Sequence, residues 1–202
     1  MDLNNLKYIY NIDDETITKR SLVDSENGRK TALKELIGEA VIKRFALWNR
    51  LFPNYQSVKK ITSKKNQKDG IDFMVTAEDG TIYNIDLKSL VGNYEWDGTE
   101  RSDGKTFEQD VIRAPIELRQ NGIFTNIPSK KTDYLLYIWT DPDTAQSTYS
   151  LLDYKMISDI SYKCDKVVCE NKKMEPLPYI HHTSNNGTGE YILFPAVAFR
   201  LH

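Results

Sequence analysis

Apolar side chains recur at every second position in two neighbouring segments near the middle of the chain, residues 70–75 and 81–90. This period of two is typical of β-strands that bury one face. The intervening Glu78-Asp79-Gly80 ends in a glycine, which suits the left-handed position of a three-residue hairpin loop. The two segments are therefore predicted to form a β-hairpin.

The predicted loop also sets the hairpin register. Met74 is expected to face Asn84, and Asp72 to face Asp86, with Lys88 on the same face of the sheet. Two carboxylates directly across a ladder repel each other unless a cation lies between them. A hard, oxygen-preferring cation such as Mg²⁺ would meet that need. The alternative interpretation is that these polar residues form the solvated side of an edge hairpin.

A long segment before the hairpin, Ala32 to Phe52, carries apolar residues at helical spacing. It contains two acidic side chains that could accompany the aspartates, Glu35 and Glu39. We prefer Glu39, because apolar residues extend onto its side of the helix and a covered glutamate needs a partner. The alternative for Glu39 is an ordinary ion pair with Lys43, four residues later.

The pattern Ile71-Asp72, thirteen intervening residues and Asp86-Leu87-Lys88 resembles the signature of the PD-(D/E)xK nuclease superfamily. Ile71 stands where that motif has a proline, and the resemblance covers about residues 32–139. It implies an α/β (α+β) chain with a restriction-endonuclease-like core. Such a core is a central mixed β-sheet flanked by helices in the order α-β-β-β-α-β, here with extra C-terminal strands.

The resemblance also implies a role for each candidate. Asp72, Asp86 and Glu39 would hold one or two Mg²⁺ ions, for which Mn²⁺ could substitute, and the main-chain carbonyl of Leu87 would complete the shell. A bound cation lowers the pKa of water and neutralises charge on the scissile phosphate. Lys88 would orient the attacking water or stabilise the charge that develops on phosphorus. The predicted catalytic side chains are thus those of Glu39, Asp72, Asp86 and Lys88.

Beyond the hairpin, residues 92–105 are polar and glycine-rich, which indicates a long functional loop. Residues 106–109 resemble a capping box that opens a helix, which Pro115 would kink and residues 121–122 would end. The continuous apolar run Tyr134 to Trp139 predicts a central strand buried on both faces.

The last third of the chain is predicted to add smaller elements. They are a strand over 149–153, a short helix near 156–160, and one or two strands over 191–201 that Pro195 interrupts. His181 and His182 are expected in a polar loop. Adjacent histidines point to opposite sides of an extended chain, so we do not take them as a metal-binding pair.

The 202 residues are expected to form one domain, with 40% hydrophobic and 28% charged residues. Its core would span 32–139, preceded by an N-terminal arm over 1–30 and followed by a C-terminal elaboration over 140–202. No apolar run reaches the length of a membrane span, and residues 1–5 lack the features of a signal peptide. Two cysteines are too few for a disulfide framework. We therefore expect a cytoplasmic protein with free thiols.

A net charge of −2 is unusual for a nucleic-acid-binding protein, but basic residues are concentrated on both sides of the hairpin. The candidates for contacting a DNA backbone are Lys59, Lys60, Lys64, Lys65, Lys68, Arg101 and Lys105. We interpret the lysine-rich stretch as a loop beside the metal site. The alternative is a solvated turn.

Together these features predict a Mg²⁺-dependent DNA endonuclease of restriction type that acts as a homodimer and uses no nucleotide cofactor. Two alternatives remain open. One is a phage or repair nuclease that acts on branched or single-stranded DNA. The other is a non-catalytic DNA-binding or assembly protein that retains the fold.

Overall fold

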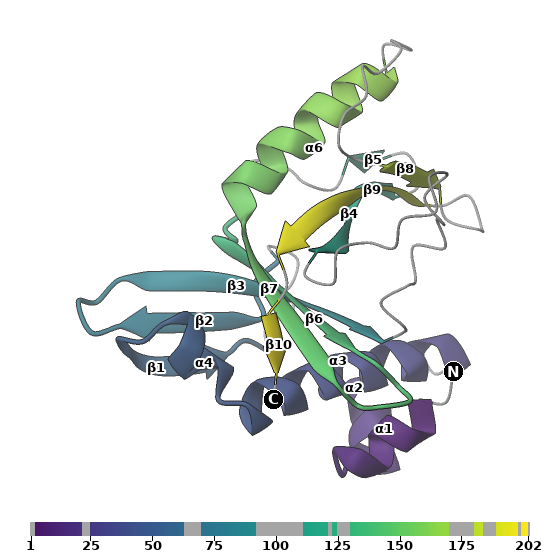
Figure 1. Cartoon of the computed structure of the whole chain (residues 1–202), viewed down its shortest axis with the longest axis vertical. Coiled ribbons are helices and arrows are strands. Elements are labelled where there is room, and N and C mark those ends of the chain that lie inside the picture. The colour runs from purple at the N-terminus through teal and green to yellow at the C-terminus, as the bar shows by residue number, and fades with distance from the viewer. Residues whose placement is uncertain are drawn as a thin grey trace.

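A mixed six-stranded sheet forms the centre of the molecule (Figure 1). The computed structural model describes residues 3–21, 25–62, 70–91, 111–120, 123–124, 130–169, 180–183, 189–197 and 199–201. The strands follow the order β1 (Tyr55–Lys60), β2 (Phe73–Ala77), β3 (Ile82–Val91), β6 (Tyr134–Thr140), β7 (Ser147–Asp153) and β10 (Phe199–Leu201). Only β3 and β6 run parallel among these neighbours. The predicted α+β class with a mixed sheet flanked by helices is confirmed.

Helices cover one face of this sheet. They are α1 (Leu3–Ile9), α2 (Asp14–Arg20), α3 (Glu26–Arg44) and α4 (Leu47–Leu51). The helix predicted over 32–52 is therefore two helices. It begins earlier than expected, because the Ser25 hydroxyl accepts a hydrogen bond from Gly28 N at 3.1 Å and caps α3. It breaks at Ala46, whose left-handed backbone (φ 48°) separates α3 from α4.

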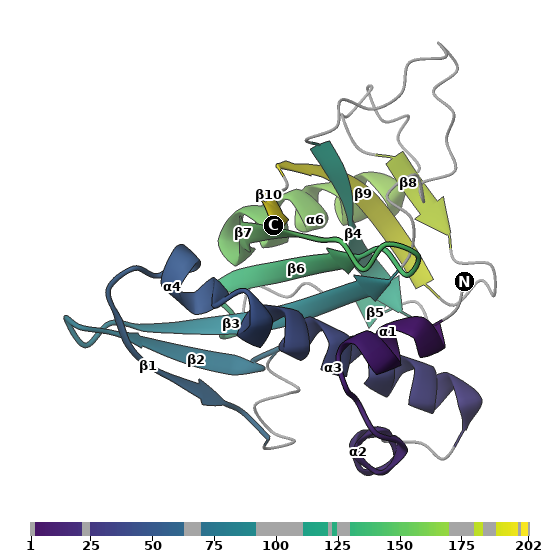
Figure 2. The same cartoon turned by 60° about the horizontal axis from the view of Figure 1, so that its bottom comes forward.

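The main hydrophobic core lies between α3 and the sheet. Ile37 and Val41 of α3 pack in the same buried cluster as Val75, Ile85 and Ile138. Figure 2 shows α3 crossing the sheet, with α1 and α2 on the outer side of α3. Burial of aliphatic side chains from several elements supplies the main driving force for this packing.

The N-terminal segment belongs to this core. Leu6 of α1 is fully buried and Ile17 of α2 is 4% exposed, and both belong to the same buried cluster as Ile37 and Val41 of α3. The N-terminal arm expected over residues 1–30 thus contains two packed helices and the first turns of α3.

A second, four-stranded sheet covers part of the opposite face, together with α6 (Tyr154–Cys169) (Figure 1). Its strands follow the order β5 (Ile123–Phe124), β4 (Val111–Gln120), β9 (Gly189–Val197) and β8 (Ile180–Thr183). Ala114 and Ile116 of β4 share a buried cluster with Tyr137 of β6 and Ile157 of α6. The Tyr137 hydroxyl donates to the Pro115 carbonyl at 3.1 Å and so ties the two sheets together.

The prediction of a helix kinked at Pro115 is wrong, because residues 111–120 form β4. Ala114 and Ile116, two positions apart, are both buried, which is the period of a strand. Proline is tolerated there because β5 pairs with β4 at Arg119 and Gln120, and no described strand pairs with that side of β4 at Pro115. Residues 92–110 and 121–122, to which the functional loop, the capping box and the helix end were assigned, lie outside the described residues.

Other differences fall in the last third of the chain. α6 runs to Cys169, well beyond the short helix expected near 156–160. His181 and His182 lie in β8 rather than in a loop, because pairing with β9 gives this polar segment a backbone partner. Pro195 lies within β9, which ends at Val197, and β10 begins at Phe199. The apolar run Tyr134–Trp139 lies in β6 as predicted, with residues 135–139 buried.

Within the described ranges, the structure contains no helix that is long and apolar enough to cross a membrane.

Candidate acidic site

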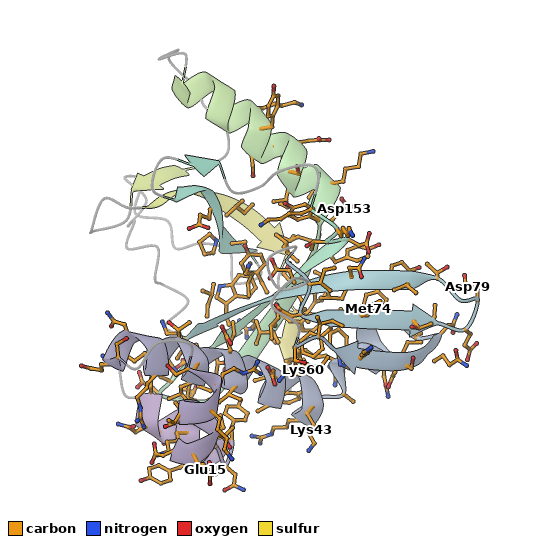
Figure 3. The ribbon with its side chains drawn as sticks, turned by 180° about the vertical axis from the view of Figure 1, so that it is seen from behind. Glu15, Lys43, Lys60, Met74, Asp79 and Asp153 are labelled. Carbon is orange, nitrogen blue, oxygen red and sulfur yellow. The ribbon has the colours of Figure 1, made fainter. Side chains whose placement is uncertain are left out.

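The β2–β3 hairpin has the register that the sequence predicted. Met74 pairs with Asn84, and Ala77 N donates to Thr81 O at 2.8 Å. Gly80 has a positive φ of 84°, and its N–H donates to Ala77 O at 3.0 Å to close the loop. Figure 3 shows Asp79 at the hairpin tip and Met74 further back along β2. The two aspartates lie at the far end of this ladder.

Asp72 lies where β2 leaves the ladder. The last paired residues are Phe73 and Ile85, and Asp72 N donates to Ile85 O at 2.9 Å. The Asp72 side chain then replaces the backbone as a partner for β3, because its Oδ2 accepts a hydrogen bond from Leu87 N at 2.8 Å. The N–H and C=O of one strand residue point to the same side. The Leu87 carbonyl therefore points toward the side from which Asp72 approaches.

Asp86 is buried beside Asp72, with 6% of its surface exposed. Its Oδ1 accepts from Lys88 Nζ at 2.9 Å, while the Lys88 side chain is 46% exposed. A methyl group built on Gly70 would lie 3.4 Å from Asp86 Oδ2 and 2.8 Å from Thr132 Oγ1. The backbone at Gly70, which has φ +73°, therefore covers one side of the Asp86 carboxylate.

The charge of Asp86 acts on the neighbouring Asp72. Burial raises the pKa of Asp72 to about 6, and the charge of Asp86 is the next contribution, while the hydrogen bond from Leu87 N and the charge of Lys88 lower it. Burial alone would lower the pKa of Lys88, but its interactions with Asp86, then Asp72 and Glu117, raise it overall. Lys88 therefore stays protonated and offsets only part of the negative charge. The site favours an additional cation.

The two glutamates of α3 have different environments. The carboxylate of Glu39 forms ion pairs with Arg20 of α2 and Lys60 of β1, one through each oxygen, rather than with Lys43 as helical spacing suggested. Figure 3 shows Lys60 on the side of the sheet that faces the helices. Both oxygens of Glu39 are thus occupied by cations of the chain.

The charge of Glu35 acts on the aspartate site. Its Oε2 lies 4.0 Å from Arg20 Nε, a much looser contact, and its side chain is 51% exposed. Burial raises the pKa of Glu35, with Arg20 acting against this, and Lys88 is also among the charges that lower it. Glu35 in turn contributes to the raised pKa of Asp72. The metal-binding role assigned to Glu39 stays a prediction, but the geometry favours Glu35.

Three residues that sequence reasoning did not select lie near the site. Arg20 holds the α3 glutamates, Glu117 of β4 raises the pKa of Lys88, and Lys130 precedes β6. Burial, followed by the charge of Lys88, lowers the pKa of Lys130. A strand assignment for residues 111–120 would have placed Glu117 on a sheet. No local signal indicated Arg20 or Lys130.

The predicted DNA-contacting residues are only partly described. Lys59 and Lys60 lie on the edge strand β1 and not on a loop, because residues 55–60 pair with β2, which corrects the expectation. Lys59 is exposed, whereas Lys60 is bound to Glu39. The other five candidates, Lys64, Lys65, Lys68, Arg101 and Lys105, lie outside the described residues.

The donor set fits a hard cation that also takes ligands from water or substrate. Among the residues that the structure describes, no three or more His, Cys, Asp or Glu side chains gather closely enough to hold a metal ion. Mg²⁺, however, commonly binds through one or two carboxylates and keeps waters or phosphate oxygens in its remaining positions. Asp72 and Asp86, with the Leu87 carbonyl directed to the same side, provide such a set.

Comparison with known proteins adds no relative. No protein-family model, curated protein or solved structure matches this chain.

Proposed function

We propose that this chain is a Mg²⁺-dependent DNA endonuclease, with restriction-type cleavage as the first choice. The proposal is supported by the sequence pattern around Asp72 and Asp86-Leu87-Lys88 and by the geometry of these residues at the end of the β2–β3 ladder. Hydrolysis of a phosphodiester needs charge neutralisation and an oriented water, and this site offers groups for both.

The observation that carries the proposal is the close approach of Asp72 to the buried Asp86. Burial and then the charge of Asp86 make Asp72 harder to ionise, and together they raise its pKa. Like charges on neighbouring strands are costly, so a chain that keeps them together has a use for a cation between them. Asp72 is already oriented by Leu87 N, and Asp86 by Lys88.

A bound Mg²⁺ would supply a water of lowered pKa and neutralise negative charge on the phosphate. Asp72 and Asp86 would hold the ion, and the Leu87 carbonyl would be a third donor. Lys88 is half-exposed, so its ammonium can turn from Asp86 toward a non-bridging phosphate oxygen or the attacking water. The water oxygen forms a bond to phosphorus, the bond from phosphorus to the leaving sugar oxygen breaks, and that oxygen takes up a proton.

Glu35 is our choice for the acidic residue of the preceding helix. Its side chain is half-exposed, and its nearest described cation is Arg20, whose Nε lies 4.0 Å away, which leaves Glu35 able to bind an ion directly or through water. Glu39 serves in our proposal to join α2, α3 and β1 through Arg20 and Lys60.

A plasmid-nicking assay tests the proposal. Wild-type chain with Mg²⁺ is expected to nick DNA, whereas addition of EDTA or the Asp86→Asn substitution should abolish cutting. Asp79→Asn is the matched control, because Asp79 is an exposed acid at the tip of the same hairpin (Figure 3). If wild type cuts duplex, single-stranded and branched DNA no better than Asp86→Asn does, the nuclease function is refuted.

One observation favours the non-catalytic alternative, a DNA-binding or assembly protein with this fold. Lys88 already pairs with Asp86 at 2.9 Å, which satisfies part of the buried charge without a metal. Such a protein would bind DNA equally well with Mg²⁺ and with EDTA and would leave every substrate in the nicking assay intact.

A further inference from the structure

A pocket of about 500 Å³ opens at the start of α6, next to the acidic site. Its walls come from the segment before β6, from β3 and from the first turns of α6, and they include Lys130, Thr132, Tyr134, Tyr154, Lys155 and Ser158. Asp153, labelled at the foot of α6 in Figure 3, lines it as well. The volume lies within the range of sites that hold one small molecule, about 300–1,000 Å³.

Two lining residues connect this pocket to the carboxylates. Thr132 Oγ1 donates to Gly70 O at 2.8 Å, on the backbone segment that covers Asp86. A methyl group built on Gly70 would lie 3.4 Å from Asp86 Oδ2 and 3.7 Å from Lys130 Cδ. The Lys130 side chain therefore runs along the boundary between the pocket and the acidic site.

The two lysines of the pocket form no ion pair with any residue that the structure describes. Among the described residues, neither Lys130 nor Lys155 has an ion pair within 4.0 Å. Three aspartates also line the pocket: Asp133 Oδ2 accepts from Asn84 N at 2.7 Å, Asp153 Oδ1 accepts from Met156 N at 2.9 Å, and Asp159 is exposed on α6.

Lys130 is also only partly exposed. A half-covered ammonium without a carboxylate partner gains most from binding an anion. The position of the pocket makes a nucleic-acid phosphate the suitable anion, because the neighbouring carboxylates would hold the cleaved bond.

We propose that this pocket binds one nucleotide of the substrate strand, with Lys130 contacting the backbone phosphate next to the bond that the acidic site would cut. The tyrosine rings that line the pocket offer an apolar surface to the sugar or base. The inference rests on the proposed nuclease function for the identity of the strand. The phosphate contact itself can be measured without cleavage.

The test uses full-length Asp72→Asn chain, in which cutting is expected to be absent, and a fluorescently labelled DNA. Binding is measured by fluorescence anisotropy at salt concentrations from about 50 to about 200 mM. Over this range, phosphate contacts make log K for DNA binding fall linearly with log[salt]. Adding Lys130→Met should weaken binding about tenfold, as expected for one lost charge-assisted contact. It should also make the slope of log K against log[salt] shallower by about 0.7–0.9.

Lys131→Met is the matched control, since Lys131 is adjacent in sequence, exposed and not among the pocket residues. It should leave the slope unchanged, and Lys130→Arg should keep the parental slope. Equal slopes for Lys130→Met and Lys131→Met, or a parental chain that binds no DNA, would overturn the phosphate contact.

Wild-type nicking with Mg²⁺, measured in parallel, separates the two proposals. A chain that cuts while Lys130→Met leaves the slope unchanged refutes only the pocket. A chain that never cuts, yet shows the slope change at Lys130, refutes the nuclease function and supports a phosphate-binding pocket.

Discussion

Replacing Asp72 by asparagine is expected to stabilise the metal-free protein at neutral pH. Leu87 N donates a hydrogen bond to Asp72 Oδ2 at 2.8 Å in the wild-type chain. Asparagine keeps the size of the side chain and an oxygen that can accept this hydrogen bond. It removes a negative charge that burial and Asp86 make unfavourable. A substitution at the proposed site would thus make the chain more stable and less active, a combination typical of functional residues.

The magnitude follows from the pKa of Asp72, which rises from 3.8 to about 6 on folding. Between these pH values the folded chain holds a proton that the unfolded chain has released, so the free energy of unfolding falls as pH increases through this window. Above about pH 6, Asp72 is ionised in both the folded and the unfolded chain, and the loss of stability that its charge causes is complete. At about 1.4 kcal/mol per pH unit it amounts to about 3 kcal/mol, and solvent around the partly exposed carboxylate reduces the expected value to about 2 kcal/mol.

Urea unfolding in EDTA, followed by tryptophan fluorescence from about pH 4 to 7.5, measures this difference. The stability advantage of Asp72→Asn should grow across the series, and Asp143→Asn, at an exposed acid, controls for the added amide. Saturating Mg²⁺ should stabilise wild type and shrink the advantage, because an ion bound only by the folded chain adds its binding free energy. Parallel pH curves for Asp72→Asn and wild type would refute the electrostatic reasoning.

Three further predictions test other contacts. Glu35→Gln should slow Mg²⁺-dependent nicking by about tenfold or more, and Glu39→Gln should slow it less; initial rates that rank the other way would restore Glu39 as the helical ligand. Gly38→Ala should lower the free energy of unfolding by about 1 kcal/mol or more, because the new methyl would lie 2.7 Å from Ser89 Cβ. Urea titrations should show a smaller loss in a Ser89→Gly background, and wild-type stability of Gly38→Ala would contradict the close packing. Tyr137→Phe should cost about 1–2 kcal/mol by removing the hydrogen bond to β4, and hydrogen exchange should then speed up at β4 amides; unchanged exchange there would argue against this link.

Local patterns were enough to predict the hairpin and its register. The alternation of apolar residues and the glycine at position 80 both act over a few residues, and together they bring Asp72 close to Asp86. The apolar run Tyr134–Trp139 was equally clear, since a short continuous apolar run suits a strand covered on both faces, and it lies in β6.

The choice between the α3 glutamates depended on contacts distant in sequence. Glu39 is held by Arg20 from one side and Lys60 from the other, and neither partner is at helical spacing from it. Helical spacing identifies neighbours within one helix, such as Lys43. It cannot identify side chains from other elements that tertiary packing places beside the helix. This is why Glu39 was preferred over Glu35 as the helical ligand.

The error at Pro115 had a different origin. A capping-box pattern upstream and a proline within an apolar stretch were interpreted with helical rules, whereas pairing with β9 gives residues 111–120 their strand conformation. A pairing partner about 80 residues away cannot be seen in local propensity, and Glu117 was missed with it.

The parallel pairing of β3 with β6 has a consequence for biosynthesis. The first three strands of the sheet are consecutive in sequence and can pair as soon as residues 55–91 leave the ribosome, but the cover over Asp86 also includes Thr132 and strand β6. Until that later stretch is made, the carboxylates lack this cover, and the divalent ion that we propose for the folded site would be held more weakly. Under the proposed nuclease function, a nascent chain would therefore carry the acidic pair in an inert form, and activity would require that β6 has been synthesised.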